Sequence, residues 1–299
     1  MFPFLFGMVC LLTILPIHYA DAQLEDAIKQ LTSDNAKGYL QPYVTAFGAN
    51  MNTGLYHSAE ISNMGLTIKF DLIAMGTLIG DNEKSYKAVP PVPFDQSAVS
   101  TATIFGGQGT VVNKTIGSDS LEYQFQNGQI KATVFPLAVP QLTIGDFFGT
   151  QAVIRYIPIP QIKDFPKTTL FGFGVRHSVS QYIPVIPLDV AASVFYQTLK
   201  IGDIFNAKSF NLGVQASKSF AVVTLYGGLQ FESSSMDVSY DYSGKYGLPT
   251  GTPIKLTMEG GNKFRCTTGL ALDLAILHFY ADANFGKVTV ISGGLGFGI

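Results

Sequence analysis

The 299-residue sequence contains no tryptophan, only two cysteines and only 13% charged residues. Soluble domains carry about 25% charged residues, so this low charge indicates a chain that contacts lipid. Cys10 falls in an apolar leader, which leaves Cys266 alone and excludes an intramolecular disulfide. The formal net charge of −2 gives no support to nucleic-acid binding.

Long apolar runs are missing after the leader. The longest candidate, residues 183–195, contains Pro184, Pro187 and Asp189. A transmembrane helix needs about 20 predominantly apolar residues, which no later stretch supplies. A hydrophobic chain without a helical span is typical of a membrane β-barrel, in which strands alternate between lipid-facing and lumen-facing residues. A soluble β-sandwich is the alternative.

The first 22 residues have the pattern of a secretory signal peptide. They carry no charge before Asp21 and end on Ala20-Asp21-Ala22, a small-x-small cleavage pattern. We therefore expect residues 1–22 to be removed after Ala22. An uncleaved membrane anchor is the alternative interpretation.

The clearest period-two alternation lies in residues 262–299, which predict three consecutive strands. In the first of them, Phe264 and Leu270 share one face, whereas Arg265 and Asp273 share the other. Similar alternation recurs upstream from residue 66. The pattern predicts an all-β fold: a transmembrane antiparallel β-barrel of about 14 strands, preceded by a short N-terminal helix or plug.

Two stretches between these strands predict other structures. Asn127-Gly128 is a tight-turn dipeptide and predicts a hairpin between residues 121–126 and 129–135. Residues 136–149 follow no period and are expected to be irregular. Separate strands are predicted over 219–232 and 236–242.

The N-terminal region of the mature chain contains one credible amphipathic helix, over residues 24–36. Leu24, Ala27 and Leu31 fall on one face, and acidic residues occupy the first turn. Residues 39–60 then mix aromatics, glycine and asparagine without a period. We expect residues 23–60 to form the helix and a plug-like segment, and residues 61–299 to form the barrel. The plug candidates are Tyr43, Phe47, Asn50, Asn52, Tyr56 and His57.

Four segments carry a family resemblance. They are YLQPYVTAFGANMNTGLYHSAE (39–60), GDFFGTQAVIRYIPIPQI (145–162), FGFGVRHSVSQYIP (171–184) and LDVAASVFYQ (188–197). With them, the chain resembles uncharacterised outer-membrane barrel proteins of Bacteroidota, a domain of unknown function. The arrangement is also similar to that of FadL-type transporters of hydrophobic compounds, which implies an N-terminal plug inside a barrel. The resemblance places the mature protein in the outer membrane of a Gram-negative bacterium.

Several polar residues share the parity of the predicted inner face. Charges there pair with one another or line water, because at the lipid midplane they cost roughly 2–4 kcal/mol. They fill the lumen as a salt-bridge network or line a path for a ligand. The candidates are Lys69, Asp71, Glu122, Gln124, Arg155, Arg176, Arg265, Asp273, His278, Tyr280 and Asp282.

No motif indicates catalysis, a cofactor or a metal. His177 stands beside Ser178 and Ser180, but both serines have the opposite parity on a strand, so a nucleophile–base pair is not expected. The histidines and Cys266 lack metal-ligand spacing. We predict that the protein is not an enzyme.

Two functions remain after this exclusion. The first is a barrel that binds or passes a hydrophobic or amphipathic small molecule beside its plug. The second is a structural or interaction barrel with a closed lumen, acting through surface loops such as 81–97 and 233–252. Both imply outer-membrane lipid and the outer-membrane assembly machinery as partners.

Overall fold

The computed structural model of the chain describes residues 26–161, 166–183 and 186–299. The expected signal peptide and the start of the expected helix lie outside this range. Within it, no helix has the length and apolar character needed to cross a bilayer. The elements are α3 (Ser33–Met51), η2 (Asp81–Glu83), η3 (Ser180–Tyr182), β1 (Met64–Leu78), β2 (Ser85–Ala88), β3 (Val99–Ala102), β4 (Val111–Ile116), β5 (Asp119–Gln124), β6 (Val134–Phe147), β7 (Thr150–Ile159), β8 (Thr168–Ser178), β9 (Asp189–Ile201), β10 (Phe205–Phe220), β11 (Val223–Asp241), β12 (Pro253–Glu259), β13 (Phe264–Leu274), β14 (Leu277–Phe285) and β15 (Val290–Gly298).

Within the described residues, ten strands close into an antiparallel barrel. Their order is β10-β9-β8-β7-β6-β1-β15-β14-β13-β11, and pairing of β10 with β11 completes the ring. Strand β12 pairs with the far end of β11 outside this ring, and β2–β3 and β4–β5 form separate two-stranded sheets. The all-β barrel with a short N-terminal helix is confirmed, whereas the expectation of about 14 barrel strands is not.

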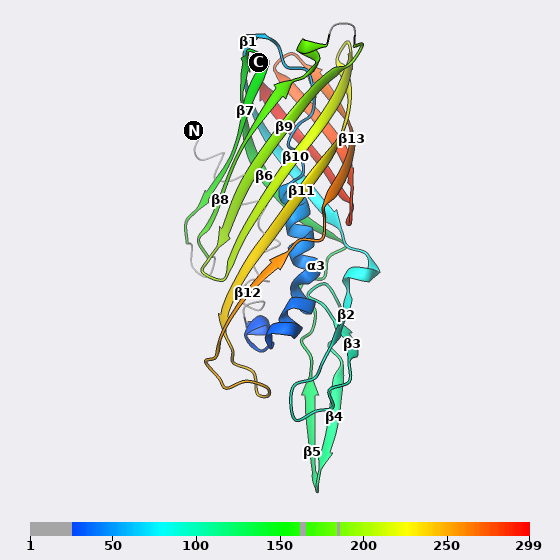
Figure 1. The fold of residues 1–299 in the computed structure, drawn as a ribbon, viewed down its shortest axis with the longest axis vertical. Coiled ribbons are helices and arrows are strands. Elements are labelled where there is room, and N and C mark those ends of the chain that lie inside the picture. The colour runs from blue at the N-terminus through cyan, green and yellow to red at the C-terminus, as the bar shows by residue number, and fades with distance from the viewer. Residues whose placement is uncertain (1–25, 162–165, 184–185) are drawn as a thin grey trace.

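The barrel has two ends, which we call upper and lower as drawn in Figure 1. Strand β1 begins and β15 ends at the upper end. Helix α3, the two small sheets and β12 lie toward the lower end. The segment between β1 and β6, residues 79–133, carries both small sheets, and we call it the extension.

The strand count differs because two local signals were misinterpreted. Residues 223–241 form one continuous strand where two were predicted, since the register with β10 continues through Ser233 and Ser234. Strand β5 pairs with β4 across a turn at Gly117, so Asn127-Gly128 does not form the predicted hairpin. Both β4 and β5 belong to the extension.

Strand β6 contains Pro136 and Pro140, which led us to expect an irregular segment. Both prolines lie in the part of β6 that pairs with β1 alone, because the pairing with β7 begins at Gln141. Proline is tolerated where one edge of a strand is open, since its missing N–H then costs no ladder bond. The prediction for residues 136–149 was therefore wrong.

An apolar band surrounds the barrel. Its outward side chains are largely exposed and come from Leu66, Ile68, Phe70, Leu212, Val214, Leu225, Leu229, Leu270, Phe279, Ile291, Leu295 and Phe297. Aromatic side chains border the band: on β10 they are Phe210 and Phe220, ten residues apart. At 3.3 Å per residue and the usual strand tilt, they stand about 25 Å apart along the barrel axis, which is the height of a bilayer-facing band.

The alternation predicted for the last three strands is present. On β13, Phe264 and Leu270 are 72% and 54% exposed, whereas Arg265 and Ala271 are 2% and 5% exposed. Leu270→Arg should therefore place a charge in the apolar band, which in a membrane barrel lowers stability by about 2–4 kcal/mol. The adjacent Ala271→Arg should assemble, because its side chain would enter the polar lumen. Outer-membrane levels of both variants test this, and loss of Ala271→Arg alone would contradict the assigned faces.

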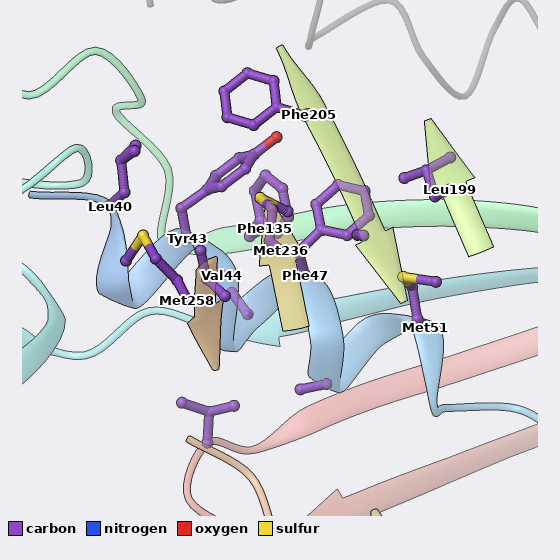
Figure 2. Close-up of a cluster of buried hydrophobic side chains, with 14 of the residues drawn as sticks. Leu40, Tyr43, Val44, Phe47, Met51, Phe135, Leu199, Phe205, Met236 and Met258 are labelled. Carbon is purple, nitrogen blue, oxygen red and sulfur yellow. The ribbon is translucent and has the colours of Figure 1, made fainter. Parts of the chain in front are cut away.

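Helix α3 packs across the lower part of the barrel. Figure 2 shows Tyr43 and Phe47 facing Phe135 of β6 and Phe205 of β10. The ring centroids of Tyr43 and Phe135 are 5.3 Å apart. Tyr39 is fully buried, and its hydroxyl donates to the Asn127 carbonyl at 2.8 Å. Burial raises the pKa of Tyr39 well above its ordinary value, and a hydrogen bond with the Gln129 side chain lowers the pKa by a smaller amount.

The helix begins later and ends later than the sequence predicts. Residues 26–29 are helical, but residues 30–32 interrupt the helical conformation before α3 starts at Ser33. Helix α3 then continues through Pro42 and Gly48, two residues that disfavour helix interiors. Tertiary packing outweighs this propensity, since most residues of α3 are buried. Residues 39–51, expected to be irregular, are therefore helical.

Candidate functional site in the barrel lumen

The C-terminal end of α3 is held inside the barrel by Arg155 of β7. Its Nε donates to Gln141 Oε1 at 2.9 Å, and its two terminal nitrogens donate to the carbonyls of Met51, Thr53 and Gly54 at 2.7–3.1 Å. A longer bond of 3.4 Å reaches Gln197. All five N–H groups of the guanidinium are thereby used, although the side chain is only 2% exposed.

Two further arginines bind the same segment from other strands. Arg265 of β13 donates to the Ala49 carbonyl at 2.7 Å and to the Thr53 hydroxyl, and its Nε pairs with the buried Glu232 of β11 at 2.8 Å. Arg176 of β8 donates to the Ser58 carbonyl. We call residues 33–60 the plug and these three arginines the latch.

Two of the carbonyls that the latch binds, those of Ala49 and Met51, are groups that a helix leaves open at its end, and the others lie beyond α3. The last carbonyls of a helix lack partners within it, and the helix dipole makes this end negative. Guanidinium groups are therefore suited to bind there. Gly54 has a φ of +67°, and a Cβ at this position would lie 2.7 Å from Ile73 Cγ2, so glycine allows the turn that presents its carbonyl to Arg155.

Beyond the plug, a polar cavity of about 370 Å³ opens toward the upper end of the barrel. We call it the vestibule. Its floor is formed by Tyr56, His57 and Ser58 of the plug, and its wall by inner side chains of the barrel. His278 Nδ1 pairs there with Asp273 Oδ1 at 2.6 Å. The charged residues of the vestibule are Glu60, Lys69, Asp71, Asp146, Arg176 and Asp273.

Several polar atoms at the vestibule lack a hydrogen-bond partner among the described residues. They are the Tyr280 hydroxyl, Arg176 Nε and both ring nitrogens of His57. Tyr280 and Arg176 are each 6% exposed. Buried polar groups are nearly always hydrogen-bonded, so a group of unpaired ones around one cavity marks a place where a ligand or water can bind. No cluster of three or more His, Cys, Asp or Glu side chains suited to a metal occurs in the described chain.

Comparison with known proteins places this latched barrel in a family. The model of DUF6588, a family of unknown function, matches residues 1–299. The chain belongs to that family. No curated protein matches it.

The solved structures that match the chain include an outer-membrane protein and the membrane units of two autotransporters, all at low TM-scores. A loop-deletion mutant of OmpT from Vibrio cholerae is 9% identical, covering 79% of this chain and all of that one, with a TM-score of 0.27. The transport unit of the autotransporter AIDA-I from Escherichia coli is 9% identical over 86% and 98% of the two chains, with a TM-score of 0.29. The translocator domain of NalP from Neisseria meningitidis is 11% identical over 94% and 98%, with a TM-score of 0.24.

The structure distributes the predicted lumen residues over four places, and Arg176 belongs both to the vestibule and to the latch. Vestibule residues are Lys69, Asp71, Arg176, Asp273, His278 and Tyr280. Arg155 and Arg265 belong to the latch, and Asp282 accepts a hydrogen bond from Tyr226 at 2.9 Å in the barrel wall. Glu122 and Gln124 were placed wrongly: both lie exposed on β5 in the extension, because β5 is not a barrel strand.

The plug candidates also divide by position. Tyr43 and Phe47 pack in the apolar lower part, and Asn50 bonds the Phe135 carbonyl and the Thr77 hydroxyl. Asn52 has no side-chain partner among the described residues. Tyr56 and His57 line the vestibule.

The prediction missed the side chains that orient or neutralise the latch arginines. Gln141 and Gln197 orient Arg155, and Glu232 neutralises Arg265. Gln197 also donates to the Met51 carbonyl at 2.7 Å. Parity alone could have found Gln197, since it alternates with the outward Tyr196 on a predicted strand.

Proposed function

We propose that this protein is an outer-membrane β-barrel closed by its own N-terminal plug, with a vestibule that binds a small polar solute. The observation that carries the proposal is the group of unpaired polar atoms of Tyr280, Arg176 and His57 around one cavity. The proposed location is the outer membrane of a Gram-negative bacterium after signal-peptide cleavage near Ala22. Outer-membrane lipid and the assembly machinery are its proposed partners.

The membrane location is supported by the apolar band and its aromatic borders. A closed barrel has no unpaired strand edge, which a bilayer could not hydrogen-bond. The apolar band also has the height of the lipid-facing band of outer-membrane barrels. The purified protein should therefore be heat-modifiable, with boiled and unboiled samples migrating differently on detergent gels. Recovery of a folded, soluble monomer without detergent would overturn the membrane assignment.

The vestibule favours a polar solute over the hydrophobic one suggested by the sequence. Its wall presents Lys69 and Arg176 as cationic donors and Asp71 and Asp273 as anionic acceptors. A solute with both donors and acceptors, such as a sugar or a zwitterion, matches this mixture. A hydrophobic solute would leave these groups desolvated and unpaired, which costs about 1–3 kcal/mol for each buried group.

Tyr280 gives a direct test of the vestibule. Tyr280→Phe removes a hydroxyl that has no hydrogen-bond partner among the described residues. The temperature at which half of the protein loses its folded gel mobility should therefore stay unchanged or rise slightly. Tyr226→Phe is the matched control: its hydroxyl donates to Asp282 at 2.9 Å, so its loss should destabilise the barrel by about 1–3 kcal/mol. A large loss of stability in Tyr280→Phe would show that this hydroxyl is structural rather than available to a solute.

Binding completes the test. Isothermal titration of the barrel with glucose, glycine, succinate and oleate samples polar, zwitterionic, anionic and hydrophobic solutes. A heat of binding for one polar probe that disappears in Tyr280→Phe supports the vestibule site. If only oleate binds, the hydrophobic ligand predicted from the sequence is supported instead.

A second candidate function rests on the extension. Phe94, Tyr123 and Tyr246 form an aromatic cluster with centroid distances of 5.2–6.2 Å, which joins the extension to the loop after β11. Burial raises the pKa of Tyr123 to about 12, with a smaller contribution from Tyr242. A packed module of this kind suits binding to a macromolecule, and its deletion would abolish such binding while leaving the vestibule intact.

A further inference from the structure

The two ends of the barrel differ in the length of their connections. At the upper end, β6 and β7, β10 and β11, and β13 and β14 are each joined by two residues, and residues 179–188 with η3 join β8 to β9. At the lower end, β9–β10 and β14–β15 are joined by three and four residues, but residues 160–167 join β7 to β8. The two longest connections are also there: the extension joins β1 to β6, and residues 242–263 with β12 join β11 to β13. Outer-membrane barrels have short turns on the periplasmic side and long loops on the extracellular side.

The ends also differ in chemistry. The tight turns of the upper end present apolar side chains: Phe148 is 81% exposed, and Val222 and Ile276 are each 47% exposed. The lower end presents exposed charged side chains on the extension and the loop after β11, among them Asp81, Lys87, Asp119, Lys131 and Lys245. Short apolar turns suit a position at the membrane interface. The charged lower end, where the extension projects beyond the barrel in Figure 1, suits a position in water.

From these two asymmetries we infer that the lower end faces the outside of the cell and that the plug runs inward through the barrel. This inference rests on the proposed outer-membrane location. Helix α3 begins at the lower end, and its C-terminal end lies in the latch. Residues 55–63 then continue to the upper end, where β1 starts.

Two surfaces follow from this orientation. The extension and residues 26–32 are displayed at the cell surface, where they are accessible to macromolecules outside the cell. The vestibule opens to the periplasm, so its solute reaches it from the periplasmic side. The plug therefore enters the barrel from the extracellular end and not from the periplasm.

Cysteine labelling of cells tests the orientation. The native cysteines are replaced by Cys10→Ala and Cys266→Ser, and single cysteines are introduced at three exposed positions. Ser118→Cys lies at the tip between β4 and β5, Asp26→Cys precedes α3, and Val222→Cys lies in a tight upper turn. A membrane-impermeant maleimide is applied to intact cells and to cells with a permeabilised outer membrane.

Ser118→Cys and Asp26→Cys should react equally in both preparations, whereas Val222→Cys should react several-fold more after permeabilisation. The reverse pattern would overturn the orientation, and so would equal labelling of all three in intact cells. Fractionation and the gel shift of the same samples separate the two proposals. A heat-modifiable outer-membrane protein with reversed labelling contradicts the orientation alone, whereas a soluble protein contradicts the proposed function.

Discussion

Arg265→Met should destabilise the barrel by about 3–5 kcal/mol, which is the cost of leaving one member of a buried ion pair without its partner. Glu232 is 1% exposed, and Arg265 is the cation that faces it at 2.8 Å. The same change removes the donor to the Ala49 carbonyl of α3. The thermal midpoint of the gel shift, or refolding in urea, measures the loss.

The double variant Arg265→Met/Glu232→Leu separates the ion pair from the plug contact. Replacing both ions of a buried pair with apolar groups is often nearly neutral, so the double variant should recover most of the lost stability. The deficit that remains reports the contacts of Arg265 with Ala49 and Thr53. Full stability of the single variant would show that Arg265 does not hold the plug.

Deletion of residues 26–54 should convert a closed barrel into a conducting one. These residues supply the helix and every carbonyl that Arg155 binds. Without them, the polar inner wall would be hydrated along the barrel axis. Planar-bilayer recordings should show discrete conductance steps in the deletion variant and none in the full-length protein.

A deletion within the extension is the matched control for the plug deletion. The amide of Phe125 already donates to the Thr110 carbonyl at 3.0 Å, so residues 111–124 can be excised and the two ends joined directly. This variant loses β4 and β5 but keeps the plug, and its conductance should equal that of the full-length protein. If the folded plug-deletion variant conducts no more than the full-length protein, the plug does not close the lumen.

The sequence predicts much of the barrel wall because alternation is a local property. An apolar outer face and a polar lumen impose opposite requirements on neighbouring residues, as at Leu270 and Ala271. The same logic places Arg155 and Arg265 on the inner face. It fails for Glu122, because an alternating hairpin outside the barrel has the same pattern as a barrel strand.

The site itself depends on contacts that no local pattern encodes. Arg155 binds carbonyls about one hundred residues earlier in the chain, and backbone carbonyls leave no trace in a sequence. The helix was misplaced for a related reason. Its interior includes Pro42 and Gly48, and only burial against strands such as β6 and β10 makes it stable.

The connection between plug and wall limits how far the plug can travel. Residues 52–63 lie between α3 and β1, and twelve residues reach at most roughly 40 Å when fully extended. A helix released from the lumen therefore stays tethered close to its own barrel. Its effective concentration at the lumen is in the millimolar range. Reclosure is consequently a unimolecular event, and the fraction of open molecules does not depend on how many copies the membrane holds.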